Sequence, residues 1–428
     1  MTWRPALPLV AIALALGACA PLPPSDPARP DPGSPPSGPD ATARVPAETL
    51  GEWGELVVPT GGYGSALAAH PVSPALLYLL TDRGPNVDGS GGCDKLFPFP
   101  AFAPRIVLVE RVDDELRLHR TIPLRRPDRT LASGLPNPPG AGGTGEIPCT
   151  PDGARLPFDP GGLDPEGLVA WDDGSFWVAD EYGPHVVRFG PDGVERERRS
   201  PLDGGLPAVL SRRRPNRGME GLTRVPGTEV LVGAMQSPLD NPDEGVRERS
   251  RVVRLVAIDV AHGATRQFAY LLDAPEGRVS AAVAIADSTL LVAETDAEMP
   301  GDGSAVQRIY RVDLRGATDV GDPADAPAGR TFDGRTLEEL ADSAGLAAAG
   351  VAPVRKALAV DLLAAGFPHD KPEGLALLVD GALALSNDDD FGLADAEGGA
   401  APKVLPVLGV RDFSEVRFLS IPAEATPP

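Results

Sequence analysis

The chain has 428 residues, of which 42% are hydrophobic and 23% charged, a composition typical of a globular protein and not of a disordered one. Its formal net charge of −22 disfavours binding to nucleic acid and to anionic lipid headgroups. An anionic ligand would therefore need a local cluster of cations or a bound metal. Proline and glycine each occur 49 times, which indicates many turns and few long helices.

The first residues have the pattern of an export signal. A short basic start precedes an apolar run over 6–16, which is too short to span a bilayer. Leu16-Gly17-Ala18-Cys19 resembles the lipobox of bacterial lipoproteins, which implies a cleaved signal peptide over 1–18 and a lipidated Cys19. Ala20 replaces the Asp of an inner-membrane retention signal, so we expect an outer-membrane anchor on the periplasmic or cell-surface side. The alternative is an ordinary secretory signal with a chance cysteine.

The rest of the chain divides into a tether and one domain. Residues 19–46 comprise the lipidated cysteine and a stretch rich in Pro, Ser, Asp and Gly, which predicts a semi-rigid tether. Residues 47–428 are expected to form one folded domain, monomeric and attached to the membrane by the lipid anchor only. Cys93 and Cys149 then remain, and an even count in an exported chain predicts a disulfide, with two unpaired loop thiols as the alternative.

The body of the chain reads as short apolar or β-branched segments between turns such as Asp173-Gly174 and Asp380-Gly381, which predicts an all-β fold. The expected strands include 76–81, 105–110, 175–179, 185–189, 229–233, 251–259, 289–293, 308–313 and 382–386. One stretch, 336–349, has the leucine spacing of a helix and lies within an insertion.

A repeat organises these segments. The tripeptide Glu-Gly-Leu begins at Glu166, Glu220 and Glu373, each time opening a predicted strand, and related units begin at Ser65 and Ser280. The spacing of the closest copies matches one four-stranded blade, so we predict a β-propeller of five blades. Six blades are the alternative, with one hidden in the gap before the last copy. Residues 48–59 are expected to pair with 414–421 and close the ring.

Five motifs, taken together, resemble a known family. They are Thr-Asp-Arg-Gly-Pro-Asn at 81–86, Asp-Pro-Glu-Gly-Leu at 164–168, Ala-Asp-Glu-Tyr-Gly-Pro at 179–184, Asn-Arg-Gly-Met-Glu-Gly at 216–221 and Lys-Pro-Glu-Gly at 371–374. Their order resembles the bacterial "esterase-like activity of phytase" family, the phytase-like propeller domain, over about residues 50–420. The resemblance implies a β-propeller and a hydrolase of phosphate or other esters.

Oxygen-bearing side chains recur at equivalent positions of the repeat. In a propeller the loops at one end of the inner strands converge on the mouth of a tunnel, so these side chains are expected to meet there. Buried carboxylates that meet need protons or a cation, and Ca²⁺ accepts roughly six to eight oxygen ligands. The alternative is that each glutamate braces adjacent blades through backbone amides. The candidate metal ligands are Asp82, Glu166, Asp180, Glu181, Glu220, Glu294, Asp296, Glu373, Asn387 and Asp388.

Three cations lie inside the same motifs. Arg83, Arg217 and Lys371 are the candidates for binding a small anionic ester substrate, or they pair with the neighbouring carboxylates. The arginine run over 212–214 is interpreted as a solvated loop. His185 follows one of the motifs and is a minor acid–base candidate, whereas no Gly-x-Ser-x-Gly nucleophile elbow occurs in the sequence.

The leading hypothesis is a calcium-assisted hydrolase of phosphate or other esters, with Glu220, Asp180 or Glu166 as the catalytic carboxylate. A lactonase or carboxylesterase is the second reading. The third is a non-catalytic propeller that binds a partner or glycan and holds a structural calcium.

Overall fold

The structure is a computed structural model and describes residues 41–113, 115–143, 145–301, 303–396 and 399–420. The predicted signal peptide, Cys19 and most of the predicted tether lie outside these residues. Over the described ranges, no helix has both the length and the apolar character needed to cross a membrane.

Three sheets have four strands each, in sequence order from the first strand to the last. They are β11 (Pro165–Ala170), β12 (Phe176–Asp180), β13 (His185–Phe189) and β14 (Glu195–Arg199); β15 (Met219–Arg224), β16 (Val230–Met235), β17 (Val252–Asp259) and β18 (Thr265–Leu271); and β19 (Arg278–Ala286), β20 (Thr289–Thr295), β21 (Gln307–Asp313) and β22 (Arg355–Asp361).

A fourth sheet has eight strands. Its order is β23 (Pro372–Leu377), β24 (Leu383–Asn387), β29 (Glu415–Leu419), β1 (Thr42–Arg44), β9 (Glu115–Pro123), β8 (Arg105–Val112), β5 (Leu76–Leu80) and β4 (Ala66–Ala69). A single parallel residue pair, Arg44 with Glu115, joins its two halves at the β1–β9 boundary. We therefore treat the halves as two four-stranded units and call each four-stranded unit a blade.

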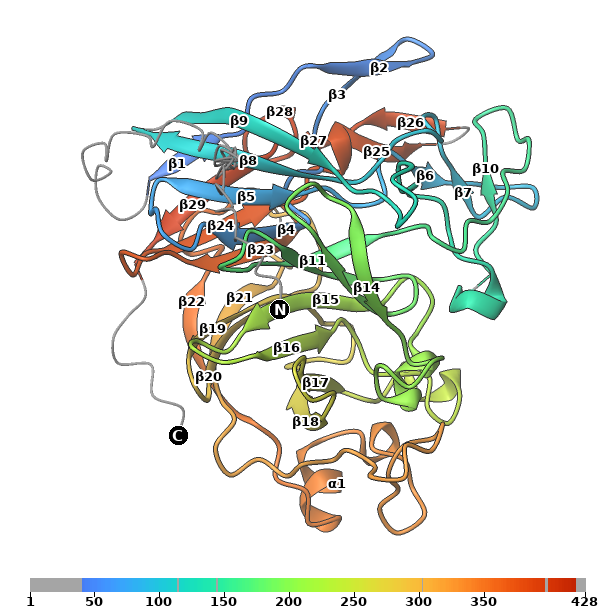
Figure 1. The fold of residues 1–428 in the computed structure, drawn as a ribbon, viewed down its shortest axis with the longest axis vertical. Coiled ribbons are helices and arrows are strands. Elements are labelled where there is room, and N and C mark those ends of the chain that lie inside the picture. Colours follow the sequence, from blue (N-terminus) through green and yellow to red (C-terminus); the bar gives the residue numbers. More distant parts are fainter. Residues whose placement is uncertain (1–40, 114, 144, 302, 397–398, 421–428) are drawn as a thin grey trace, which may run out of the picture. The chain divides into compact units, whose positions relative to one another are not determined.

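The inner strands of these blades contact one another in the cyclic order β4, β11, β15, β19, β23 and back to β4. Apolar residues of neighbouring blades pack between them, and Figure 1 shows the sheets following one another from the blue to the red end of the chain. The structure therefore confirms the predicted all-β fold of the propeller type.

The strand that joins the first and last blades differs from the predicted one. β1 pairs antiparallel with β29, with Thr42 opposite Arg417, whereas the predicted closing segment 48–59 folds back on itself as the hairpin β2 (Thr49–Trp53) and β3 (Leu56–Pro59). Gly54 has φ = +61° at the hairpin turn, a conformation that favours glycine and reverses the chain there. The folded domain thus begins inside the segment that we assigned to the tether.

The Glu-Gly-Leu repeat has a packing explanation. In β11, β15 and β23 the register shifts at the glutamate, which is the geometry of a β-bulge. A Cβ atom added to Gly167 would lie 2.9 Å from the backbone nitrogen of Leu222, and one added to Gly221 would lie 2.7 Å from that of Ala282. Gly374 is similarly crowded by β4. The glycine therefore lets the inner strands of adjacent blades approach closely.

The predicted helix over 336–349 is broken into two short pieces. The first is a 3₁₀ turn, η4 (Glu338–Leu340), and the second is the helix α1 (Ser343–Ala348). Ala341 has φ = +63°, which interrupts the helix, and the Asp342 side chain then caps α1 at its amino end. The leucines predicted to share a face do pack together in a buried cluster.

Small sheets and turns complete the described structure. They are the sheet of β6 (Val87–Asp88), β7 (Lys95–Leu96) and β10 (Pro148–Cys149), the hairpins β25 (Leu393–Ala396) with β26 (Gly399–Pro402) and β27 (Val404–Leu405) with β28 (Val410–Arg411), and the 3₁₀ turns η1 (Pro139–Ala141), η2 (Ala208–Arg212), η3 (Glu244–Val246) and η5 (Asp390–Gly392). A disulfide between Cys93 and Cys149 ties the loop before β7 to β10. β6 contacts both β25 and β26, which lie beside it in Figure 1.

Candidate functional site

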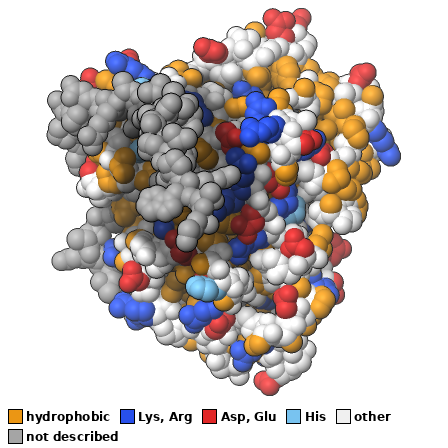
Figure 2. Space-filling view, viewed as in Figure 1, with side chains coloured by type: hydrophobic (Ala, Val, Ile, Leu, Met, Phe, Trp, Pro, Cys, Tyr) orange, Lys and Arg blue, Asp and Glu red, His pale blue; other side chains and the backbone are white. Residues whose placement is uncertain are grey.

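A cavity of about 400 Å³ lies at the amino ends of four inner strands, β11, β15, β19 and β23. Its charged lining residues are Asp82, Arg83, Lys95, Asp164, Glu166, Glu181, Arg217, Glu220, Arg278, Asp370, Lys371, Glu373, Asp388, Asp390, Asp395 and Lys403. The face in Figure 2 likewise carries acidic and basic side chains close together near its centre. The cavity therefore offers both cation-binding and anion-binding groups.

Most of the predicted site residues line this cavity. They are Asp82, Arg83, Glu166, Glu181, Arg217, Glu220, Lys371, Glu373 and Asp388. The three glutamates of the repeat lie at the β-bulges, where the extra residue re-aims a side chain out of the sheet. The bulge and the close-packed glycine together explain why a Glu-Gly pair recurs at the cavity wall.

Asp180 was predicted as a ligand or catalytic group, but it does not line the cavity. Its side chain is fully buried and accepts hydrogen bonds from the backbone nitrogens of Asp164, at 2.7 Å, and Gly183, at 3.1 Å. It also bonds Nδ1 of His185, at 2.7 Å. Asp180 therefore holds the loop that carries Asp164, and His185 is occupied with it outside the cavity.

Glu294, Asp296 and Asn387 are also absent from the cavity lining. The Glu294 carboxylate lies 2.8 Å from both the Tyr270 hydroxyl and the Lys356 Nζ. Asn387 bonds the backbone around residues 413–415, and Asp296 accepts bonds from nearby backbone nitrogens. In β12 and β24 the last residue, Asp180 or Asn387, bonds inside the protein. The residue that follows it, Glu181 or Asp388, was also a predicted ligand and lines the cavity.

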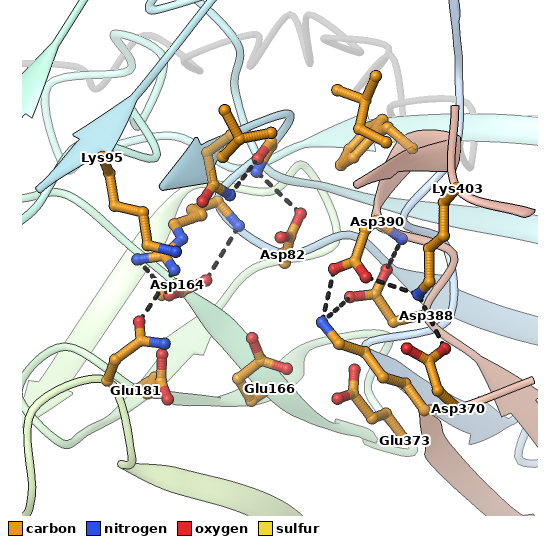
Figure 3. A pocket seen from close by; sticks show the side chains of 18 of the residues that line it. Asp82, Lys95, Asp164, Glu166, Glu181, Asp370, Glu373, Asp388, Asp390 and Lys403 are labelled. Carbon is orange, nitrogen blue, oxygen red and sulfur yellow. Dashed lines mark hydrogen bonds and ion pairs between the residues drawn. The ribbon is translucent and has the colours of Figure 1, made fainter. Parts of the chain in front are cut away.

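Three carboxylates meet on one side of the cavity. One oxygen each from Asp164, Glu166 and Glu181 lies within 4.8 Å of the other two. In Figure 3, Asp164 and Glu181 lie to the left, with Glu166 between them and the residues on the right. With the nearby Glu220 we call these four residues the acidic cluster.

Burial and mutual repulsion make the acidic cluster difficult to ionise. Burial, followed by Glu220 and Asp164, raises the pKa of both Glu166 and Glu181 well above the ordinary value. Burial, followed by Glu373 and Asp164, raises the pKa of Glu220 to about 8. The Oε1 atom of Glu220 is buried without a hydrogen-bond partner. Protons or a bound cation must therefore compensate these carboxylates.

Arg83 is the cation nearest to the acidic cluster, and carboxylates already hold it. Its guanidinium lies 3.3 Å from Asp164 and 3.0 Å from Glu146, and its backbone nitrogen donates to Asp164 at 3.1 Å. Asn216 accepts a further bond from it, at 2.9 Å. Arg83 thus neutralises Asp164 but leaves Glu166 and Glu220 without a cation within ion-pair distance among the described residues.

The opposite side of the cavity contains a network in which each carboxylate has a lysine. Lys371 lies 2.5 Å from Asp390 and 3.6 Å from Asp388, whereas Lys403 lies 2.6 Å from Asp390 and 2.8 Å from Asp370. We call these five residues the paired sector. Its members Asp370, Asp388, Asp390 and Lys403 lie on the right side of Figure 3. Burial alone would raise the pKa of Asp390, but the two lysines bring it below its ordinary value.

Several lining residues had no role in the prediction. Asp164 lies in one of the family motifs but was given no role, and Asp390 lies two residues after the predicted ligand Asp388. The fold also brings Arg278, Asp370 and Lys403 to the cavity. The sequence signal nearest to Arg278 is the repeat unit that begins two residues later, at Ser280.

The arginine run over 212–214 is not the solvated loop that we expected. Arg213 is 6% exposed, and it donates 2.8 Å hydrogen bonds to the backbone oxygens of Glu181 and Gly142. A Cβ atom on Gly218 would lie 2.3 Å from the same Glu181 oxygen. The run therefore packs against the backbone that presents Glu181 to the cavity.

The donor set of the acidic cluster fits a hard cation. Asp164, Glu166 and Glu181 provide oxygen ligands only, and their spacing allows one ion to contact all three. The cluster contains no histidine or cysteine that would favour zinc or copper. A divalent cation would also relieve the repulsion among these carboxylates.

Two curated proteins match part of this chain. An uncharacterized secreted protein of Arthroderma benhamiae is 26% identical over 53% of this chain and 53% of its own length, so the chain spans about half of that relative. The L-arabinolactonase of Azospirillum brasilense is 36% identical over 24% of this chain and 31% of its own length.

Among solved structures, an oxidoreductase (glucose dehydrogenase) of Thermus thermophilus has 16% identity and a TM-score of 0.33, covering 89% of this chain and 96% of the other. The α-L-arabinofuranosidase of Podospora anserina has 8% identity and a TM-score of 0.37, covering 90% and 98%. Likenesses this distant carry no argument about the reaction. The model of the phytase-like family, described as "esterase-like activity of phytase", matches residues 58–391, and the chain belongs to that family.

Proposed function

We propose that this protein is a calcium-assisted hydrolase of small anionic esters, with phosphate esters as the first candidate. The observation that carries the proposal is the acidic cluster, in which Asp164 pairs with Arg83 but Glu166, Glu181 and Glu220 have no cation within ion-pair distance among the described residues. Membership of a family named for esterase-like activity supports the reaction class. The proposed reaction breaks the bond between the acyl or phosphoryl group and the alcohol oxygen.

Asp164, Glu166 and Glu181 are the residues that would hold the cation. When bound, a hard divalent ion supplies Lewis-acid polarisation of the ester oxygen and lowers the charge repulsion of the site. Arg83 and Arg213 fix this part of the wall, since Arg83 bonds Asp164 and Arg213 bonds the Glu181 backbone. Arg83 and Arg213 thus hold the cation ligands in place.

Glu220 is the proposed general base. A base works best when its pKa lies near the working pH, and burial brings the pKa of Glu220 to about 8. Its Oε1 atom has no partner among the described residues and is free to accept a proton from the attacking water. Arg217, three residues before Glu220 in the sequence, also lines the cavity and is proposed to bind the anionic group of the substrate.

A hydrolysis assay tests this function. Purified protein with added calcium would be offered p-nitrophenyl phosphate, p-nitrophenyl acetate and a sugar lactone, with Glu220→Gln as the variant and Glu294→Gln as the control. We expect turnover of at least one substrate, abolished by chelator and by Glu220→Gln, whereas Glu294→Gln retains it. If Glu220→Gln hydrolyses every substrate at the wild-type rate, the proposed mechanism is wrong.

A lactonase is the second candidate, since one stretch of the chain is 36% identical to an L-arabinolactonase. Both reactions need a polarised oxygen and an activated water, so the same acidic cluster would serve either. Opening of a lactone without release of phosphate from phosphomonoesters would identify the lactonase. Calcium-dependent stability with no turnover of any ester would favour the non-catalytic binding protein instead.

We also propose that the protein is exported, anchored through Cys19 to the outer membrane, monomeric and without a nucleic-acid partner. The lipobox-like sequence, the secreted relative and the disulfide support export, because disulfides persist in oxidising compartments. Labelling with radioactive palmitate and loss of the label in Cys19→Ala would test the anchor.

A further inference from the structure

Two arginines from adjacent blades line the same side of the cavity. Arg217 lies two residues before β15, and Arg278 is the first residue of β19, the next inner strand around the ring. Both belong to the cavity lining, together with Gln236 and Met299. Arg278 is part of none of the motifs by which the sequence was interpreted.

A tight turn holds Arg217 in place. The Arg217 backbone nitrogen donates to the Arg214 oxygen at 3.1 Å across Pro215 and Asn216, and Asn216 has φ = +52°. Proline followed by asparagine in the left-handed region is the chemistry of a β-turn with fixed geometry. The Asn216 side chain also accepts from Arg83, which ties the turn to the wall behind the acidic cluster.

Neither guanidinium has a carboxylate partner in the described part of the chain. No carboxylate oxygen there lies within 4.0 Å of Arg217 or Arg278, although Arg83, Lys371 and Lys403 each have one or more. Arg278 donates one hydrogen bond to the backbone oxygen of Asp296, and its Nε is buried without a partner. Burial, then Arg278 and Arg214, lowers the pKa of Arg217 to about 10. Glu220 and Glu181 also act on Arg217, from beyond 4.0 Å. Two neighbouring cations with no carboxylate in direct contact are an arrangement that an anion would stabilise.

We propose that Arg217 and Arg278 form the subsite for a compact oxyanion group of the ligand, either phosphate or carboxylate. This inference rests on the proposed function and deepens it, because it assigns the anionic group to the β15–β19 side of the cavity. Glu220 is the second residue of β15, three residues after Arg217, and it lines the same cavity as the subsite. Arg83 and Lys371, which we also predicted to bind substrate, are already neutralised by carboxylates and are not part of the subsite.

Direct binding tests the subsite without requiring turnover. Isothermal titration calorimetry would measure inorganic phosphate and acetate binding, in calcium and in chelator, to the wild type, Arg217→Gln, Arg278→Gln and the double variant. Arg129→Gln is the matched control, because that side chain is 68% exposed and pairs only with Asp192. The two anions distinguish a phosphate subsite from a carboxylate subsite.

We expect each single variant to weaken binding of the preferred anion roughly 10- to 100-fold, since a hydrogen bond to a charged group contributes about 1.5–3 kcal/mol. Arg217→Lys, which keeps the charge but loses the planar fork, should fall between Gln and wild type. Arg129→Gln should bind as the wild type does. Melting temperatures no lower than that of the wild type would show that the variants are folded and that the arginines have no bracing role.

Two results would overturn the inference. One is a wild-type protein that binds neither anion in calcium or in chelator, and the other is equal anion affinity in the wild type and the double variant. Loss of anion binding in the arginine variants of a protein that hydrolyses no ester would support the subsite and reject the proposed reaction. With an active enzyme, Arg278→Gln should raise KM for an anionic ester and leave KM for neutral p-nitrophenyl acetate unchanged.

Discussion

The acidic cluster and the paired sector are built from the same kinds of residue, yet their charges are balanced differently. In the paired sector two lysines contact Asp370, Asp388 and Asp390, so the network is largely neutral by itself. In the acidic cluster Arg83 is the only cation within ion-pair distance in the described part of the chain, and it contacts Asp164. A high number of acidic residues therefore does not by itself indicate a ligand site, whereas carboxylates without counter-ions do.

The largest expected effect concerns hydrolysis. Glu166→Gln removes a proposed cation ligand without changing the side-chain volume, so we expect the rate to fall by roughly 100- to 10,000-fold, as for loss of a catalytic group. Stability without calcium should be unchanged or higher, because one repelling carboxylate is gone. Steady-state kinetics and urea unfolding would be measured together, and a large loss of stability would instead assign Glu166 a bracing role.

The second prediction concerns the paired sector. Lys403 is 5% exposed and contacts Asp370, Asp390 and Asp412, so Lys403→Met leaves buried carboxylates without their cation. We expect a loss of about 3–5 kcal/mol in the free energy of unfolding, measured by urea denaturation. Lys95→Met is the control, because its partner Asp88 is largely exposed, and it should cost less than about 1 kcal/mol. Equal effects of the two variants would mean that burial does not separate them.

The third prediction concerns calcium. A ligand that binds only the folded state at about 100 times its Kd stabilises it by about 2.7 kcal/mol. We therefore expect chelator to lower the melting temperature of the wild type and to leave that of a Glu166→Gln, Glu181→Gln double variant unchanged. Calcium that stabilises the double variant as much as the wild type would place the ion elsewhere.

The fourth prediction concerns the pH dependence of stability. The pKa of Glu220 is about 8 in the folded protein, above the ordinary value of 4.5, so the folded state keeps a proton that the unfolded state releases. The resulting stabilisation is fully present below pH 4.5 and is lost as pH rises to about 8, with a slope of at most about 1.4 kcal/mol per pH unit. Urea unfolding in chelator at several pH values should show this slope in the wild type, and Glu220→Gln should reduce it.

The identity of the repeat residues was readable from the sequence, because both members of the Glu-Gly pair have a local cause. Gly167 and Gly221 recur because a neighbouring inner strand leaves no room for a Cβ atom, and the glutamates recur at a bulge. Glu294 bonds Tyr270 and Lys356 and does not line the cavity. Asp180 and Asn387 were predicted together with the residues that follow them, Glu181 and Asp388, because a spacing cannot tell which of two successive residues turns into a cavity. Strand alternation reverses the side chain at each step.

The all-β propeller fold, the repeat and most of the acidic residues that line the cavity were predictable from the sequence alone. These features follow from short-range patterns of turns, strands and close-packed glycines. Which charged side chains have a partner of opposite charge is evident only in the tertiary structure, because an ion pair depends on distances between residues far apart in the chain. Lys403 contacts Asp370, and Arg278 lines the cavity together with Arg217, only because the chain folds these distant segments together. The lysine-paired acids and the unpaired arginines were therefore indistinguishable until the fold brought them together.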